Sequence, residues 1–204
     1  MLKKLITLAL VGSLWGSLQT APEPDINSQF ELTTGVEVVN TETGEVIYSE
    51  SQTQTLEESS GTVTFNYEYV DYSEFGAALR SIRPDATIGG TMNPGSVSSS
   101  LTLTYSTRRD EIRLEKVSGS WSPKLGVSLT DRKVNIYNGG MAPESITKYP
   151  TANTYAFNTG WGYVIKPPSS YYLSPRALAS VRYKITGTNT PWLELRHWVD
   201  LQSA

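Results

Sequence analysis

The chain of 204 residues contains no cysteine and only one histidine, His197. Without cysteine it cannot be a disulfide scaffold, so a secreted domain of this sequence must be held together by its apolar core. One histidine and no cysteine cannot form a usual zinc site, and we predict no metal and no cofactor. The chain also lacks an Asn-x-Ser/Thr glycosylation acceptor. Both absences are more typical of a bacterial exported protein than of a eukaryotic one.

Lysine and arginine are missing from residues 21–79, which contain twelve acidic residues. Residues 80–204 contain fifteen basic and eight acidic residues. One interpretation is that the basic part binds an anionic polymer or lipid headgroups, while the acidic part masks that surface. The other is that N-terminal strands pair with C-terminal strands, so that the charges cancel within one sheet. The sequence leaves both open.

Long apolar runs are absent as well. The longest one near the start, Leu5 to Leu14, follows Lys3 and Lys4, which is the pattern of a secretory signal peptide. It is shorter than the roughly 20 residues of a membrane-spanning helix. We therefore predict a signal peptide at 1–21 and a secreted domain at 22–204 with no transmembrane span. The predicted location is extracellular, with association with the cell surface as an option.

Alternation of apolar and polar residues recurs along the chain, whereas helical periodicity is nearly absent. The segment "TVTFNYEYV" places Val63, Phe65, Tyr67 and Tyr69 on one face, and "RALASVRYKI" alternates in the same way. Turn sequences rich in Gly, Pro and Asn separate these segments. The pattern predicts an all-β protein, a single antiparallel β-sandwich of about ten short strands. The other predicted strands lie near residues 30–39, 45–50, 97–105, 109–117, 127–129, 133–137, 154–157, 163–165 and 191–199.

Three further segments have their own local signals. Ser73 could cap one or two helical turns before Pro84 ends them. The polar stretches "APEPD" and "SESQTQTLEESSG" are the segments that we expect to be flexible. We find no internal repeat and no linker long enough to divide the chain into domains.

Seven charged residues lie between Arg108 and Lys116. In a strand over 109–117, Ile112 and Leu114 fall on one face, and charges of alternating sign fall on the other. Neighbouring opposite charges would pair on a solvated face. We therefore interpret this cluster as the outer face of a hairpin rather than as an active centre.

No catalytic residue is predicted. His197 lies in a terminal strand pattern, and no G-x-S-x-G sequence is present for a serine nucleophile. A calcium loop of the D-x-D-x-D-G type is also absent. A glycosidase needs two carboxylates about 5–10 Å apart, and the sequence does not exclude such a pair.

Aromatic residues gather around Gly and Pro in "NTGWGYVIKPPSSYY". Rings held in a rigid loop can stack on sugars or on the apolar surface of a partner, and their polar atoms tolerate water. The candidate binding residues are therefore Trp161, Tyr163, Tyr171 and Tyr172. The alternative is that these rings close one end of the core.

The run from Leu101 to Gly140 resembles a pattern in small exported proteins of Gram-positive bacteria. It combines a Thr-rich strand, a charged strand, "KVSGSW", and a short strand that ends in Asp-Arg before a Gly turn. The resemblance implies export and an all-β fold. Because the function of those proteins is unassigned, it implies no catalytic residue.

Together these features predict a non-catalytic extracellular or cell-surface protein with a binding or structural role. The expected partners are a cell-envelope glycan or a surface protein, and not a nucleic acid. Two alternatives remain. One is a secreted β-pore-forming or membrane-active toxin, since strands such as "TVTFNYEYV" and "VSSSLTLTY" alternate apolar residues with Ser and Thr. The other is a secreted carbohydrate-active enzyme.

Overall fold

The computed structural model describes most of the chain beyond residue 29. The described ranges are 30–56, 60–70, 96–108, 111–140, 143–165 and 174–203. They contain eleven β-strands and no helix. The predicted signal peptide, the predicted helical turns after Ser73 and the stretch "APEPD" lie outside the described residues.

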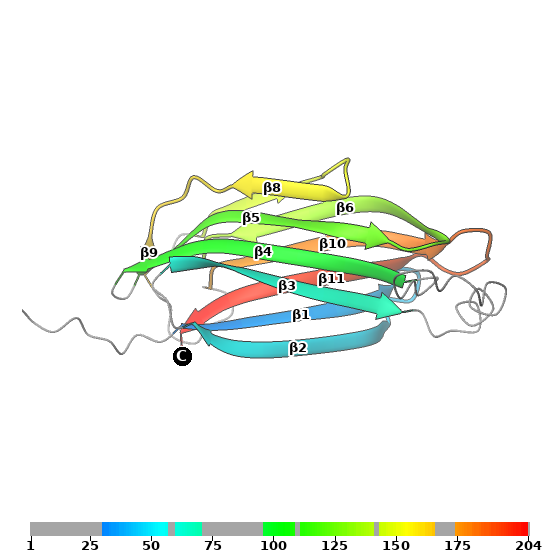
Figure 1. The fold of residues 1–204 in the computed structure, drawn as a ribbon, viewed down its shortest axis with the longest axis horizontal. Helices are drawn as coiled ribbons and strands as arrows, with labels where there is room; N and C mark the ends of the chain where they lie inside the picture. Colours follow the sequence, from blue (N-terminus) through cyan, green and yellow to red (C-terminus); the bar gives the residue numbers. More distant parts are fainter. Residues whose placement is uncertain are drawn as a thin grey trace, which may run out of the picture.

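The strands form two antiparallel sheets, drawn in Figure 1. The six-stranded sheet has the order β2-β1-β11-β10-β6-β7, and the five-stranded sheet has the order β3-β4-β5-β8, with β9 paired to β5. The six-stranded sheet contains β1 (Phe30–Asn40), β2 (Val46–Leu56), β6 (Val127–Tyr137), β7 (Ser145–Lys148), β10 (Arg176–Ile185) and β11 (Leu193–Ser203). The five-stranded sheet contains β3 (Ser60–Val70), β4 (Ser96–Arg108), β5 (Glu111–Pro123), β8 (Thr154–Asn158) and β9 (Val164–Ile165).

The alternation read from the sequence decides which side chains enter the core. On β10, Ala177, Ala179, Val181 and Tyr183 are almost fully buried, whereas Arg182 on the opposite face is exposed. The inward faces of both sheets join in one cluster, because a sheet with one apolar face must cover it with another layer. The predicted all-β antiparallel sandwich is thus confirmed.

One predicted boundary is wrong at β6. The sequence suggested separate strands at 127–129 and 133–137, but β6 runs from Val127 to Tyr137. The register with β10 shifts between Ser180 and Arg182, so two residues of β6 lie opposite one residue of β10. Asp131 lies in this bulge with a φ of 49°. A bulge lets a strand continue although its side-chain alternation is interrupted.

The polar stretch at 49–61 was also predicted wrongly in part. Residues 49–56 belong to β2, which pairs along its length with β1. Because β2 is an edge strand, its side chains are largely exposed and need not alternate with apolar ones. The four-residue edge strand β7 was not predicted, since "SITK" is too short to show a period.

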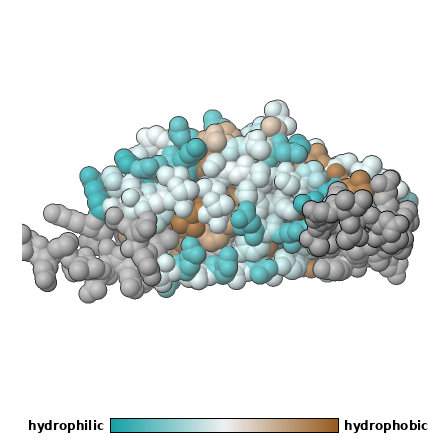
Figure 2. Space-filling view, viewed as in Figure 1, coloured by the Kyte–Doolittle hydropathy of each residue, from teal (hydrophilic) through white to brown (hydrophobic). Residues whose placement is uncertain are grey.

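The outer face of the five-stranded sheet is lined by hydroxyl groups. Side-chain hydrogen bonds join Thr64 Oγ1 to Thr102 Oγ1 at 2.8 Å and Ser100 Oγ to Ser120 Oγ at 2.9 Å. Figure 2 shows that the surface over β3, β4 and β5 is mostly pale, which marks weakly hydrophilic side chains. The Ser- and Thr-rich positions of these strands therefore face outward.

Candidate functional site

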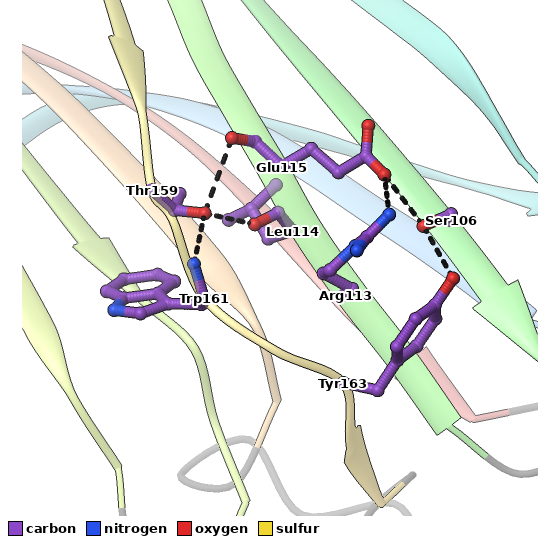
Figure 3. A network of polar contacts seen from close by, with 7 residues as sticks. All are labelled: Ser106, Arg113, Leu114, Glu115, Thr159, Trp161 and Tyr163. Atoms are coloured by element: carbon purple, nitrogen blue, oxygen red, sulfur yellow. Dashed lines mark hydrogen bonds and ion pairs between the residues drawn. The ribbon is translucent and has the colours of Figure 1, made fainter.

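Tyr163 lies over the charged hairpin formed by β4 and β5. Strand β9 follows it directly and pairs with the start of β5, with Ile165 opposite Glu111. The Tyr163 ring centroid is 4.2 Å from Cζ of Arg108 and 4.7 Å from Cζ of Arg113. Its hydroxyl is 3.1 Å from Oγ of Ser106 (Figure 3). The ring is thus held by two guanidinium groups and one hydroxyl.

The charged residues below Tyr163 pair with one another. Nε of Arg108 lies 2.6 Å from Oε2 of Glu111, and Arg113 is hydrogen-bonded to Glu115. The Ser106 hydroxyl donates to Oε1 of Glu115 at 2.9 Å. The hydrogen bond from Ser106, followed by that from Arg113, lowers the pKa of the Glu115 carboxyl. The interpretation of this stretch as a self-paired outer face holds for the described charges, and Tyr163 additionally covers it.

Trp161 lies on the segment that runs along β5 from β8 to β9, and Thr159, two residues earlier, ties this segment to β5. The Thr159 hydroxyl donates to the Leu114 carbonyl at 2.5 Å and accepts the Trp161 N–H at 3.3 Å (Figure 3). The Trp161 side chain is half-buried and packs against the core. For this residue, therefore, the alternative that the ring closes the end of the core has direct support.

Two of the four predicted contact residues, Trp161 and Tyr163, lie on the segment before β9, and their side chains have different neighbours. Tyr171 and Tyr172 lie outside the described residues. Sequence reasoning treated the charged stretch at 108–116 and the aromatic stretch at 158–172 separately, and it missed Ser106, Arg108 and Arg113 as neighbours of Tyr163. No local signal could have joined them, since the β5–β9 pairing links positions about fifty residues apart in the chain.

The fold converts the uneven charge of the sequence into a spatial separation. The described residues of β1, β2 and β3 with their connections contain six carboxylates and no Lys or Arg. β1 pairs with β11, where Glu37 lies opposite Arg196, so N- and C-terminal strands do share a sheet. The remaining basic strands follow on the far side of β11. In the six-stranded sheet, the carboxylates of β1 and β2 therefore lie on one side of β11 and most of the cations on the other.

The far side of that sheet is predominantly basic. We define the basic side as the described residues 124–148 and 174–185, which comprise β6, β7, β10 and their adjoining loops. It contains seven cationic and two acidic residues. The cations are Lys124, Arg132, Lys133, Lys148, Arg176, Arg182 and Lys184, and the acids are Asp131 and Glu144. Figure 1 shows β6 at the edge of the molecule opposite to β1 and β2.

The single histidine is sealed between the sheets. His197 has no exposed surface, its Nδ1 lies 3.0 Å from Oγ of Ser99, and the Tyr67 ring meets it edge-on at 5.1 Å. Burial lowers the pKa of His197 to about 4, so the ring is neutral at physiological pH. A substrate cannot reach this ring without separation of the sheets.

Asp200 is a second buried titratable group, on the outward side of the same strand. It is 2% exposed and lies opposite Arg176 of β10. Burial raises the pKa of its carboxyl to about 7, although the charge of Arg176 acts in the opposite direction. At neutral pH, therefore, the carboxyl is protonated in part of the molecules.

Comparisons of the chain with family models, curated proteins and solved structures find no match. Within the described residues, no cluster of three or more His, Asp or Glu could hold a metal ion. Within the same residues, no helix is long and apolar enough to cross a membrane. What the fold itself defines is the class: a two-sheet antiparallel β-sandwich.

Proposed function

We propose that this is an exported, non-catalytic protein that binds at the cell surface through the outward faces of a rigid sandwich. The observation that carries the proposal is the placement of the titratable groups. The histidine that could act as a base is enclosed in the core, and the two described carboxylates of the charged hairpin, Glu111 and Glu115, each pair with a guanidinium group. A general acid or base must be within hydrogen-bond reach of a substrate.

The surfaces that remain available favour binding rather than turnover. Tyr163 is partly exposed and lies next to Arg108, whose side chain is 63% exposed. Such combinations of an aromatic ring with cationic and hydroxyl groups offer stacking and several hydrogen-bond donors to a ligand. Residues of different strands hold the group in place, which limits the entropy lost on binding.

The test is retention of the purified protein by a bacterial envelope fraction. We expect the protein to pellet with insoluble envelope and to stay in the supernatant without it. In parallel, the same envelope glycans are assayed for release of reducing ends. Retention without release supports the proposal. Absence of retention, or release of reducing ends by the purified protein, would show that the proposed function is wrong.

A membrane-active toxin is the second candidate, and one observation favours it. β3 and β4 pair over eleven residues each, with Ser and Thr hydroxyls facing outward and residues such as Phe65 and Leu101 buried. This two-faced hairpin has the alternation of a strand that could meet lipid on one side. Release of a trapped dye from liposomes by the purified protein, at several lipid compositions, distinguishes this candidate from the binding protein.

A further inference from the structure

We infer that the basic side binds a linear polymer that carries phosphate or carboxylate groups along its length. The inference rests on the proposed function and names the chemical class of the partner. It starts from the outer face of β10, where the buried neighbours Ala177 to Ile185 force Arg176, Arg182 and Lys184 to point outward. Lys133 of β6 lies opposite Ser180 and shares this face.

Two of these cations lie against aromatic rings. Cζ of Arg176 lies 4.5 Å from the centroid of the Tyr137 ring, and Nζ of Lys184 lies 4.9 Å from that of Trp192. A ring orients a cation through its quadrupole but leaves the net charge in place. The Trp192 ring therefore orients Lys184 while its positive charge stays on this face. Arg176 lies opposite the buried Asp200 and interacts with it, so the cations considered below are Lys133, Arg182 and Lys184.

The nearby carboxylates neutralise this face only in part. Asp131 lies 3.4 Å from Arg182 in a pair whose side chains are about half exposed. Pairs of this kind are weak because solvent screens them. Glu194 lies opposite Arg182 in the register, but it is hydrogen-bonded to Arg196 of its own strand at 2.8 Å.

The spacing of the cations suits a repeating polyanion better than one small anion. Arg182 and Lys184 are two residues apart, which is about 6.8 Å along a strand, and Lys133 is a diagonal neighbour on β6. Like charges at neighbouring positions repel each other. A polymer that places an anionic group near each of them removes that repulsion, and the acidic strands on the opposite side of the sheet orient it toward β6 and β10.

The experiment measures binding of the purified protein to end-labelled polyphosphate and polygalacturonate, with dextran as the neutral polymer, over a salt series. We expect binding to both polyanions, no binding to dextran, and a loss of affinity as salt rises. Lys184→Gln should weaken binding about fivefold. The triple variant Lys133→Gln, Arg182→Gln, Lys184→Gln should weaken binding roughly a hundredfold and lower the slope of log affinity against log salt by roughly one unit per cation removed.

The matched control is Lys116→Gln, which removes one positive charge from an exposed position on the five-stranded sheet. It should bind as the unchanged protein does. Equal losses for Lys184→Gln and Lys116→Gln would overturn the inference, because net charge alone would then be responsible. Binding to dextran, binding only to vesicles of anionic phospholipid, or sedimentation of the protein by itself would overturn it as well.

Envelope retention separates this inference from the proposed function. If the triple variant loses retention while Lys116→Gln keeps it, both are supported. If retention survives high salt and the triple substitution, the protein is a surface-binding protein but the basic side is not the contact. If the unchanged protein is not retained at all, the proposed function itself has failed.

Discussion

Nδ1 of His197 on β11 lies 3.0 Å from Oγ of Ser99 on β4, although the two residues are 98 positions apart. This hydrogen bond crosses the core and joins the two sheets. Both side chains are almost completely buried. A buried hydrogen bond is worth little net free energy but is costly to break from one side, because the remaining polar group is left without water.

The first prediction concerns this bond. Ser99→Ala should lower the free energy of unfolding by about 1–3 kcal/mol, because Nδ1 of His197 would lose its partner in the core. Ser98→Ala, one position along on the outward face, should change it by less than about 0.5 kcal/mol. Urea denaturation of the two variants gives the comparison. Equal effects would mean that the contact with His197 contributes nothing.

The second prediction concerns pH. The folded-state pKa of His197 is about 4 and its ordinary value 6.5, so the unfolded chain binds more protons between these values and stability rises with pH there. The folded-state pKa of Asp200 is about 7, whereas its ordinary value is 3.8. Between these values the folded chain binds more protons than the unfolded chain, so stability falls as pH rises. The two slopes oppose each other over the shared range.

Substituting each residue in turn separates the contributions of His197 and Asp200 to the pH dependence of stability. Asp200→Asn should leave a stability that rises by up to roughly 3 kcal/mol from pH 4 to pH 6.5, because the gap in the pKa of His197 then acts alone. His197→Gln should show the opposite slope. Urea denaturation across this pH range measures both, and identical pH profiles of the two variants would contradict the assignment.

The third prediction compares three glycines. A Cβ at Gly119 would overlap the Ser100 carbonyl oxygen and the Tyr155 ring, and backbone cannot move aside cheaply. Gly119→Ala should therefore destabilise the protein by about 1–3 kcal/mol or more. At Gly35 the overlap is mainly with the Trp198 ring, so Gly35→Ala should also alter tryptophan fluorescence. Gly162→Ala meets nothing within 4 Å and is the control.

The fourth prediction separates Trp161 from Tyr163. Because the Trp161 ring packs on the core, Trp161→Ala should lower the free energy of unfolding by roughly 2 kcal/mol, less than a fully buried ring would. Tyr163→Phe removes only the hydroxyl contact with Ser106 and should cost at most about 1 kcal/mol. Thermal unfolding tests both. A larger loss of stability for Tyr163→Phe than for Trp161→Ala would contradict the placement of the Trp161 ring against the core.

Much of the fold could be predicted because the polarity of adjacent residues indicates whether a strand side chain points inward or outward. Val63, Phe65, Ala179 and Val181 lie on the inward faces that their alternation indicated. The errors lie where alternation is interrupted or unnecessary. Asp131 interrupts it in the bulge of β6, and most side chains of the edge strand β2 are exposed, so apolar residues are not required there.

The candidate site was less predictable than the fold. Trp161 and Tyr163 were identified as aromatic residues of one loop, but their different roles depend on what each ring meets. Tyr163 meets Arg108 and Arg113 because β9 pairs with β5, and Trp161 meets the core because Thr159 ties its segment to the backbone of β5. The residues next to Trp161 and Tyr163 in the sequence do not indicate either contact.

By itself, the sequence determined the all-β class, the inward faces of most strands and the uneven distribution of charge, because each follows from local order along the chain. Only the tertiary structure decided that β1 lies beside β11 and that β10, β6 and β7 continue the sheet beyond it. Strand order depends on pairing between distant segments, and that pairing places the five carboxylates of β1, β2 and their connection on one side of the sheet and the basic side on the other. Packing of the five-stranded sheet on this sheet encloses His197, which the sequence showed only as one strand residue among others.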